Sequence, residues 1–172
     1  MGTVPRRVLI TYGTKNGSTA EIADFIASVL RDEGLETEVL PPSEVRDVLP
    51  YDAVVIGGAL YMGRWHRDAR RFTRQHAGAL RERPVWLFSS GPLDPSASER
   101  DIPAVAGARR AQRRTDARDH VTFGGRLMTG AKGRMAKVIL DDGRGGDFRD
   151  LNRIAEWAGN VATEIKATAE GS

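Results

Sequence analysis

The chain has 172 residues, with 26 basic and 23 acidic side chains, a formal net charge of +3 and no cysteine. Its length suits one domain with a well-buried core and is short for two. The lack of cysteine excludes disulfides, thiolate metal sites and thiol catalysis. The sequence has no apolar run of about 18 residues, which a membrane-spanning helix needs, and its first residues lack the apolar stretch of a secretory signal. We therefore expect a cytoplasmic protein without a membrane span.

The first predicted elements are a buried strand and a helix, joined by a short polar loop. Residues 7–12 are apolar and β-branched, and residues 18–32 carry apolar side chains at three- and four-residue spacing. A strand, a polar loop and a helix start in this order favour an anion site, because the helix begins with free N–H groups and the positive end of its dipole. The residues that we expect to bind a phosphate are Thr14, Lys15, Asn16, Gly17, Ser18 and Thr19.

Two other phosphate-binding loops do not match this segment. Lys15 stands in the middle of the loop, whereas the lysine of a P-loop follows its second glycine. Only Gly13 and Gly17 are present where a dinucleotide fingerprint needs three glycines. The remaining alternative is a structural one, in which Asn16 or Ser18 simply caps the helix.

Strand-type and helix-type segments alternate along the rest of the chain. Further strands are predicted at residues 37–40, 52–57, 84–88 and 121–123, with a turn or one-turn helix at 41–43. Further helices are predicted at 65–80, at 98–114 with an interruption near Pro103, and after Asp147 as N-cap. Residues 126–146 form the one irregular region. The alternation predicts a single doubly wound α/β domain over residues 1–172, with a core of about 6–166, short disordered termini and a parallel sheet.

A ligand site is expected at one edge of this sheet. In an open parallel sheet, ligands bind beyond the carboxyl ends of the strands, where the direction of winding reverses. The loops after the first, third and fourth predicted strands should meet there, where small residues let the backbone approach a flat ring and Tyr61 can stack on it. Taken alone, either of the last two loops also fits an ordinary strand-to-helix turn. The expected ring-framing residues are Ala59, Leu60, Tyr61, Met62, Gly63, Ser89, Ser90, Gly91, Pro92 and Leu93.

Several segments resemble the flavodoxin-domain family. Thr14, Gly17 and Thr19 fit the Ser/Thr-x-x-Gly-x-Thr phosphate loop that follows the first strand of flavodoxins. The branch most similar to this chain contains the menaquinone-dependent protoporphyrinogen oxidases, and the similarity lies in residues 14–23, 51–58, 61–64 and 86–93, with Phe72 and His76. The resemblance implies bound FMN, redox chemistry and a flavodoxin-like sheet of five parallel strands in the order 2-1-3-4-5, with helices on both faces. Residues 126–146 depart from those oxidases by being shorter and less apolar.

Three functions fit the sequence. The first is an FMN-binding, flavodoxin-like oxidoreductase linked to a quinone or to protoporphyrinogen, in which the flavin carries the electrons. The second is a non-enzymatic FMN electron-transfer protein, and the third is a flavodoxin-like module that has lost the flavin. No catalytic side chain is nominated, because the flavin would do the chemistry. No metal site is expected, because the three histidines lack ligand spacing and fit surface or structural roles.

Arginine is concentrated in two segments. Residues 64–83 contain seven arginines against Asp68 and Glu82, and residues 109–118 contain five. These clusters are either solvated helix faces or a basic surface that attracts anionic partners. The expected partner is a small-molecule or protein redox partner, with a quinone or an anionic substrate as candidates, and peripheral membrane contact is compatible with the charge. Nucleic acid is not expected, because no nucleic-acid motif is present and aromatic residues are not interleaved with the arginines.

Overall fold

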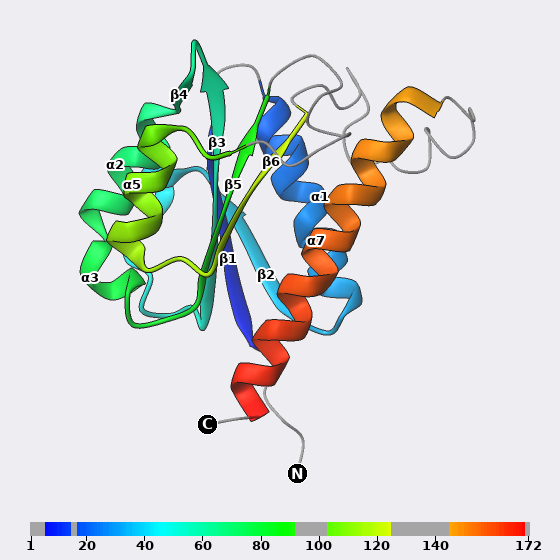
Figure 1. Ribbon diagram of the computed structural model, residues 1–172. Coiled ribbons are helices and arrows are strands. Elements are labelled where there is room, and N and C mark those ends of the chain that lie inside the picture. Colours follow the sequence, from blue (N-terminus) through cyan, green and yellow to red (C-terminus); the bar gives the residue numbers. More distant parts are fainter. Residues whose placement is uncertain (1–5, 15–16, 92–102, 125–144, 171–172) are drawn as a thin grey trace.

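The computed structural model describes residues 6–14, 17–91, 103–124 and 145–170. A parallel sheet at its centre is formed by β1 (Arg7–Gly13), β2 (Glu36–Leu40), β3 (Ala53–Tyr61), β5 (Val85–Ser90) and β6 (Asp119–Phe123). Helices α1 (Ser18–Asp32) and α7 (Gly145–Glu170) cover one face (Figure 1). Helices α2 (Arg67–Gln75), α3 (Ala77–Leu80) and α5 (Ala106–Thr115) cover the other, and the 3-10 helix η1 (Pro42–Glu44) follows β2.

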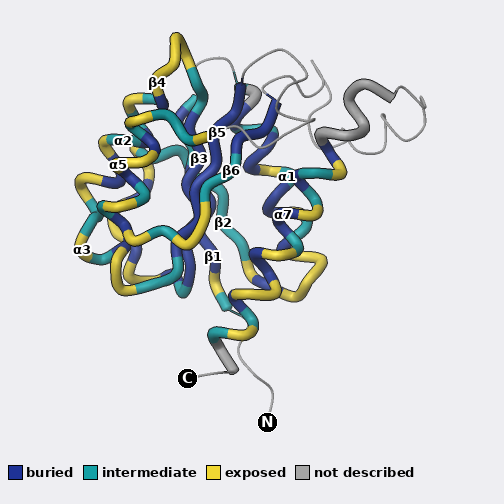
Figure 2. The backbone as a smooth tube through the Cα atoms, viewed as in Figure 1, coloured by how far each residue is buried: buried dark blue, intermediate teal, exposed yellow. Residues whose placement is uncertain are grey.

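The strands of this sheet are buried on both faces, as a parallel sheet between two helix layers requires. Along β1, Val8 and Ile10 belong to the core under α1 and α7, whereas Leu9 belongs to the core under α2 and α5. All three side chains are fully buried. Figure 2 shows the same pattern for the whole sheet, with buried residues along the central strands and on the inner sides of the helices. The continuous apolar run of β1 is thus explained by burial on both sides.

The parallel strands, counted along the chain, lie in the predicted order 2-1-3-4-5, which here reads β2-β1-β3-β5-β6. The sheet has one strand more than predicted. Strand β4 (Arg64–Trp65) pairs antiparallel with the end of β3, opposite Leu60 and Tyr61. The prediction missed it because β3 continues to Tyr61, beyond the predicted end at residue 57, and only then reverses.

The helix predicted at residues 65–80 is interrupted and begins later. Trp65 belongs to β4, and α2 begins at Arg67 with His66 as N-cap, whose Nδ1 accepts a hydrogen bond from the Asp68 backbone N–H at 3.1 Å. The interruption falls at His76, where φ is −112° and ψ is 18°, and α3 begins at the next residue. Most of the predicted segment is helical, but the sequence did not indicate where the helix breaks.

Two other helix starts differ from the prediction. Helix α5 begins at Ala106, after the expected interruption at Pro103, while residues 98–102 of the predicted helix lie outside the described residues. Helix α7 begins at Gly145, so Asp147 lies inside it and is not its N-cap. The predicted irregular region, apart from Gly145 and Gly146, and the predicted disordered ends at residues 1–5 and 171–172 also lie outside the described residues.

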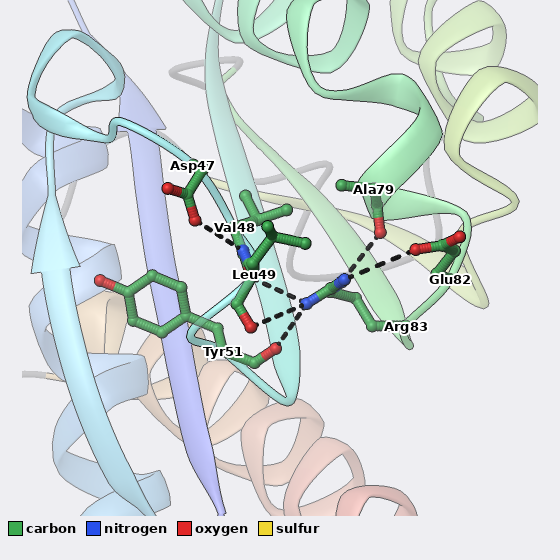
Figure 3. Close-up of polar contacts among 7 residues, drawn as sticks. All are labelled: Asp47, Val48, Leu49, Tyr51, Ala79, Glu82 and Arg83. Carbon is green, nitrogen blue, oxygen red and sulfur yellow. Dashed lines mark hydrogen bonds and ion pairs between the residues drawn. The ribbon is translucent and has the colours of Figure 1, made fainter.

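Arg83 joins the turn after α3 to the loop before β3 (Figure 3). Its Nη1 donates to the backbone oxygens of Val48 and Tyr51, each at 2.8 Å, and its Nε donates to the oxygen of Ala79 at 2.8 Å. Its side chain is only 12% exposed. This arginine therefore holds the fold together at the amino edge of the sheet and is not part of a basic binding surface.

Candidate functional site

The carboxyl ends of β1, β3 and β5 lie side by side at one edge of the sheet, at the top of Figure 1. The strand register pairs Gly13 of β1 with Gly58 of β3, and Gly58 with Ser89 of β5. Ala59 is paired with Ser90 one position further on. The structure thus brings the segments that follow three separate strands to one place, as the sequence predicts for the candidate site.

The loop after β1 ends in a turn that opens helix α1. The hydroxyl oxygen of Thr14 accepts a hydrogen bond from the Gly17 backbone N–H at 2.9 Å, and Gly17 has φ of 88°, in the left-handed region that favours glycine. Gly17 is the N-cap of α1 and provides no side-chain cap, so neither Asn16 nor Ser18 occupies the capping position that the structural alternative assigned to them. Lys15 and Asn16 lie outside the described residues, as does the side chain of Ser18.

This helix start has the electrostatics of an anion site. The first N–H groups of an α-helix have no partner within the helix, and the helix dipole places partial positive charge there. Gly17, the N-cap residue, has no side-chain oxygen that could accept from these N–H groups. The Thr14 hydroxyl accepts from Gly17 and keeps its own hydrogen to donate. Between β1 and Thr19, the described residues therefore present donors and no carboxylate, and the first acidic residue of α1 is Glu21 in its first turn.

Thr19 is placed differently from the rest of the loop. It is fully buried, and its hydroxyl forms a 2.5 Å hydrogen bond with the hydroxyl of Ser90 at the end of β5. In such a pair one hydroxyl donates and the other accepts, which leaves one hydroxyl hydrogen for a further acceptor. The pair therefore links two of the predicted site segments and retains one donor.

The predicted loop after the third strand is a β-hairpin. Ala59, Leu60 and Tyr61 belong to β3, and Met62 and Gly63 form the two-residue turn to β4, with φ of 50° and 75°. Positive φ at both central residues is typical of the tight turns that match strand twist. Tyr61 is 60% exposed and Met62 is 83% exposed, so the hairpin ends in a large apolar tip at the candidate site edge.

Trp65 anchors this hairpin, a role that the sequence reasoning missed. It is 1% exposed, and its indole Nε1 donates to the backbone oxygen of Phe88 at 3.3 Å. A Cβ placed at Gly58 would lie 2.4 Å from the Trp65 Nε1, and one at Gly57 would lie 2.1 Å from the ring of Phe88. The Gly57-Gly58 pair in a central strand was the available signal, because two adjacent glycines there make room for aromatic rings.

The segment after β5 begins with buried residues. Ser89 and Ser90 still belong to the strand, and Gly91 follows with φ of 111°. The Gly91 backbone N–H donates to the oxygen of Phe123 in β6 at 2.9 Å, and a Cβ at Gly91 would lie 3.4 Å from that of Leu60. Gly91 therefore lies against the hairpin strand. Pro92 and Leu93 lie outside the described residues.

A hydrogen-bonded pair of buried Ser89 and half-buried His120 lies behind this segment. The Ser89 hydroxyl and the Nε2 of His120 in β6 are 2.7 Å apart. Burial lowers the pKa of His120 to about 4, although the neighbouring Asp119 charge acts in the opposite direction. The ring is therefore neutral at pH 7. Among the described residues, no third side chain forms a hydrogen bond with His120 that would help to make Ser89 a nucleophile, so we assign the pair a structural role in holding β5 to β6.

Neither a metal centre nor a membrane helix is found in the described part of the chain. Within residues 6–14, 17–91, 103–124 and 145–170, no group of three or more acidic, histidine or cysteine side chains is arranged to hold a metal ion. None of the described helices is long and apolar enough to cross a membrane.

The doubly wound sheet, its strand order and the loop at the start of α1 define a flavodoxin-like fold. The sequence matches the flavodoxin domain family over residues 9–141, and the chain belongs to this family, as the motifs predicted. It is 32% identical over 85 residues to the protoporphyrinogen IX dehydrogenase (quinone) of Escherichia coli K12. That alignment covers 48% of this chain and 47% of the relative, so it spans about half the length of either protein.

Solved flavodoxin structures show the same fold. A flavodoxin from the domain Archaea matches 93% of this chain and 99% of its own, with a TM-score of 0.64 and 11% identity. Flavodoxin 2 from Bacillus cereus matches 94% of this chain and 99% of its own, with a TM-score of 0.58 and 18% identity. At these identities the likeness concerns the fold.

Proposed function

We propose that the protein binds FMN at the carboxyl edge of β1, β3 and β5 and acts as an oxidoreductase. The observation that carries the proposal is the start of α1, where no side chain among the described residues caps the first helical N–H groups after the turn from Thr14 to Gly17. Bound there, FMN would supply reversible one- and two-electron chemistry. The residues around it would bind, orient and shield the cofactor.

The donor set fits the phosphate group of FMN. Uncapped N–H groups, the Thr14 hydroxyl and the remaining hydrogen of the Thr19–Ser90 pair all donate hydrogen bonds. Lys15 and Asn16 are proposed to complete the phosphate site, with Ser18. The loop lacks the three glycines that accommodate a pyrophosphate, so we propose FMN and not FAD.

The ring of the flavin would lie between the β3–β4 hairpin and the segment after β5. Tyr61 offers an exposed aromatic ring for stacking. Gly91 has no side chain, so the flavin ring could approach its backbone next to Leu60. Met62 and Gly63 from the hairpin turn, with Pro92 and Leu93 after Gly91, complete the proposed frame. Ala59 and Ser89 are proposed to support it from within their strands.

A small-molecule electron acceptor is the proposed partner. The Escherichia coli relative is named as a dehydrogenase that acts on protoporphyrinogen IX with a quinone. We extend only the broad chemistry to this chain, namely electron transfer between the flavin and a quinone or an anionic substrate, in the cytoplasm. No protein acid, base or nucleophile at the site is required for that transfer.

The first experiment is titration of flavin-free protein with FMN, riboflavin and FAD, followed by flavin fluorescence. FMN should bind at least about tenfold more tightly than riboflavin, because a hydrogen-bonded anion contributes about 1.5–3 kcal/mol. Equal affinity for FMN and riboflavin would contradict the phosphate site, and a lack of binding by all three would leave a flavodoxin-like module without flavin.

The second experiment separates an enzyme from an electron carrier. The FMN-loaded protein is reduced chemically without oxygen and mixed with increasing concentrations of a soluble naphthoquinone. An oxidation rate that saturates with quinone concentration indicates a substrate site on the protein. A rate that rises linearly and equals that of free reduced FMN would favour a carrier that serves a protein partner.

A further inference from the structure

A groove lies between the β3–β4 hairpin, α2 and α5. Its volume is about 440 Å³, and its lining includes Arg64, Trp65, Arg70, Gly107 and Arg110. Figure 1 shows α2, α5 and β4 next to one another. The three arginines come from three different elements, so the fold and not a single helix brings them together.

The groove is strongly positive. Helices α2 and α5 each carry four arginines, and the only acidic residue in either is Asp68, which does not line the groove. Within the described part of the chain, none of Arg64, Arg70 and Arg110 forms an ion pair with a carboxylate. Solvated helix faces normally mix charges of both signs, so an uncompensated set around a concave surface points to an anionic ligand.

Part of the groove is held in place before any ligand binds. The Arg70 Nε donates to the backbone oxygen of Trp65 at 3.1 Å, and a Cβ at Gly107 would lie 3.2 Å from the Arg70 Cδ. Arg70 therefore lies across the start of α5, and its Nη groups form no hydrogen bond with another described residue. Because its side chain is already ordered, it loses less conformational entropy when it binds a ligand.

The surroundings of Arg114, a neighbouring arginine of α5, are also positively charged. The Arg114 Nη1 donates to the hydroxyl of Thr73 at 3.1 Å, where an acidic partner would have been expected. Burial lowers the pKa of Arg114, and the charges of Arg74 and Arg110 lower it further. The helix pair thus tolerates several guanidinium groups that repel one another.

We propose that this groove is a binding site for a small organic anion with two or more carboxylate or phosphate groups. Guanidinium groups bind both oxygens of a carboxylate or phosphate in parallel, and three of them line one groove here. Ala106 and Gly107 are small, and the uncapped start of α5 adds positive character in the same place. The anion site does not rest on the proposed flavin function, although Gly63 connects it to the hairpin tip.

The test measures binding of two probes, citrate and inorganic pyrophosphate, by calorimetry at fixed ionic strength. It uses the protein as purified and the protein saturated with FMN, so that pyrophosphate bound at the start of α1 is displaced and not counted. Arg64→Gln and Arg110→Gln should each weaken binding by about tenfold, the effect of losing one charged hydrogen-bond donor. Both side chains are exposed, so the variants should fold normally.

Arg113→Gln is the matched control, because it removes the same charge from α5 at an exposed position that does not line the groove. Unchanged affinity in this variant, with losses in the other two, supports the site. Equal losses in all three variants would show a general effect of surface charge and would overturn it. Failure of both probes to bind would also overturn it.

Amide chemical shifts locate the bound probe. Citrate should shift the backbone signals of Gly107 and Gly63 in the wild-type protein, and about tenfold more citrate should be needed for the same shifts in Arg110→Gln. A preference for citrate identifies carboxylates as the ligand groups, and a preference for pyrophosphate identifies phosphates. Shifts confined to Gly17 and its neighbours would place the anion at the start of α1 and would overturn the groove proposal while supporting the proposed phosphate site.

Discussion

The hydroxyl groups of Thr19 and Ser90 lie 2.5 Å apart, although the residues are 71 positions apart in the chain. Thr19 belongs to the first turn of α1, and Ser90 is the last residue of β5. Both are almost completely buried, so each hydroxyl depends on the other for a hydrogen bond. The contact fixes the start of α1, where the proposed phosphate site lies, against the end of β5, which leads into the proposed ring site.

Replacement of Ser90 by alanine should destabilise the flavin-free protein. It leaves the Thr19 hydroxyl buried without a partner, at a cost of about 1–3 kcal/mol in the free energy of unfolding, which urea denaturation measures. Ser28→Ala is the control, because Ser28 is exposed on the same helix and bonds only to the backbone oxygen of Phe25. A loss no larger than that of the control would show that the hydroxyl pair contributes little.

The double variant Thr14→Ala/Thr19→Ala should bind FMN about a hundredfold more weakly than the wild type, about tenfold for each hydroxyl lost. Flavin fluorescence titration measures the affinity. Thr14→Ser is the matched variant, because it keeps the hydroxyl that accepts from Gly17 and should keep most of the affinity. If the double variant melts earlier yet binds FMN normally, the two hydroxyls serve the fold alone.

The layout of the sheet could be predicted from the sequence because its signals are local. The apolar run of β1 is buried on both faces, and Gly17 supplies the left-handed backbone angle that the predicted loop requires. Strand β4 could not be predicted in this way. It has two residues and forms only because β3 reverses at Met62 and Gly63 and because Trp65 finds a cavity over Gly58.

The same limit applies to the candidate site. Thr19 looked like a phosphate donor from its place in the motif, and only the tertiary structure shows its contact with Ser90. Likewise, the seven arginines of one segment could not be distinguished by sequence, but Arg83 is largely covered and bonds to backbone oxygens, whereas Arg64 is exposed and lines a groove. Charge counts along a chain do not distinguish these two environments.

The contact between Gly58 and Trp65 can be measured by a double-mutant cycle. Gly58→Ala forces a methyl group against the indole and should destabilise by about 1–3 kcal/mol, while Trp65→Ala should cost about 3–5 kcal/mol through cavity formation. In the double variant the methyl group enters the cavity, so the combined loss should be smaller than the sum. Strict additivity, measured by denaturation, would show that the two positions do not interact.

Arg83→Gln should destabilise by about 2–4 kcal/mol, because the carbonyl oxygens of Val48 and Tyr51 lose their charged donor. Arg81→Gln is the control, since Arg81 is exposed and its bond to the Arg113 oxygen is 3.2 Å long. It should change the free energy of unfolding by less than about 1 kcal/mol. Similar losses of stability in both variants would mean that the effect comes from removing a surface charge and not from the hydrogen bonds of Arg83.

His120 should make the protein less stable in acid. Its pKa is about 4 in the folded protein, because burial disfavours the charged ring, and about 6.5 in an unfolded chain. Above pH 6.5 the ring is neutral in both states and costs nothing. As the pH falls from 6.5 toward 4, the ring becomes protonated in the unfolded state but stays neutral in the folded state. The free energy of unfolding should therefore fall by up to about 3 kcal/mol.

The variant His120→Gln isolates this effect, because glutamine can still bond to the Ser89 hydroxyl and does not titrate. Other groups titrate in the same range, so the quantity of interest is the difference in urea midpoint between wild type and variant, followed from pH 7 to pH 4. The wild type should lose stability faster than the variant between pH 6.5 and 4. Because burial also lowers the pKa of His76, the variant His76→Gln serves as a comparison. Parallel pH profiles for the wild type and His120→Gln would show that burial does not keep the His120 ring neutral in this pH range.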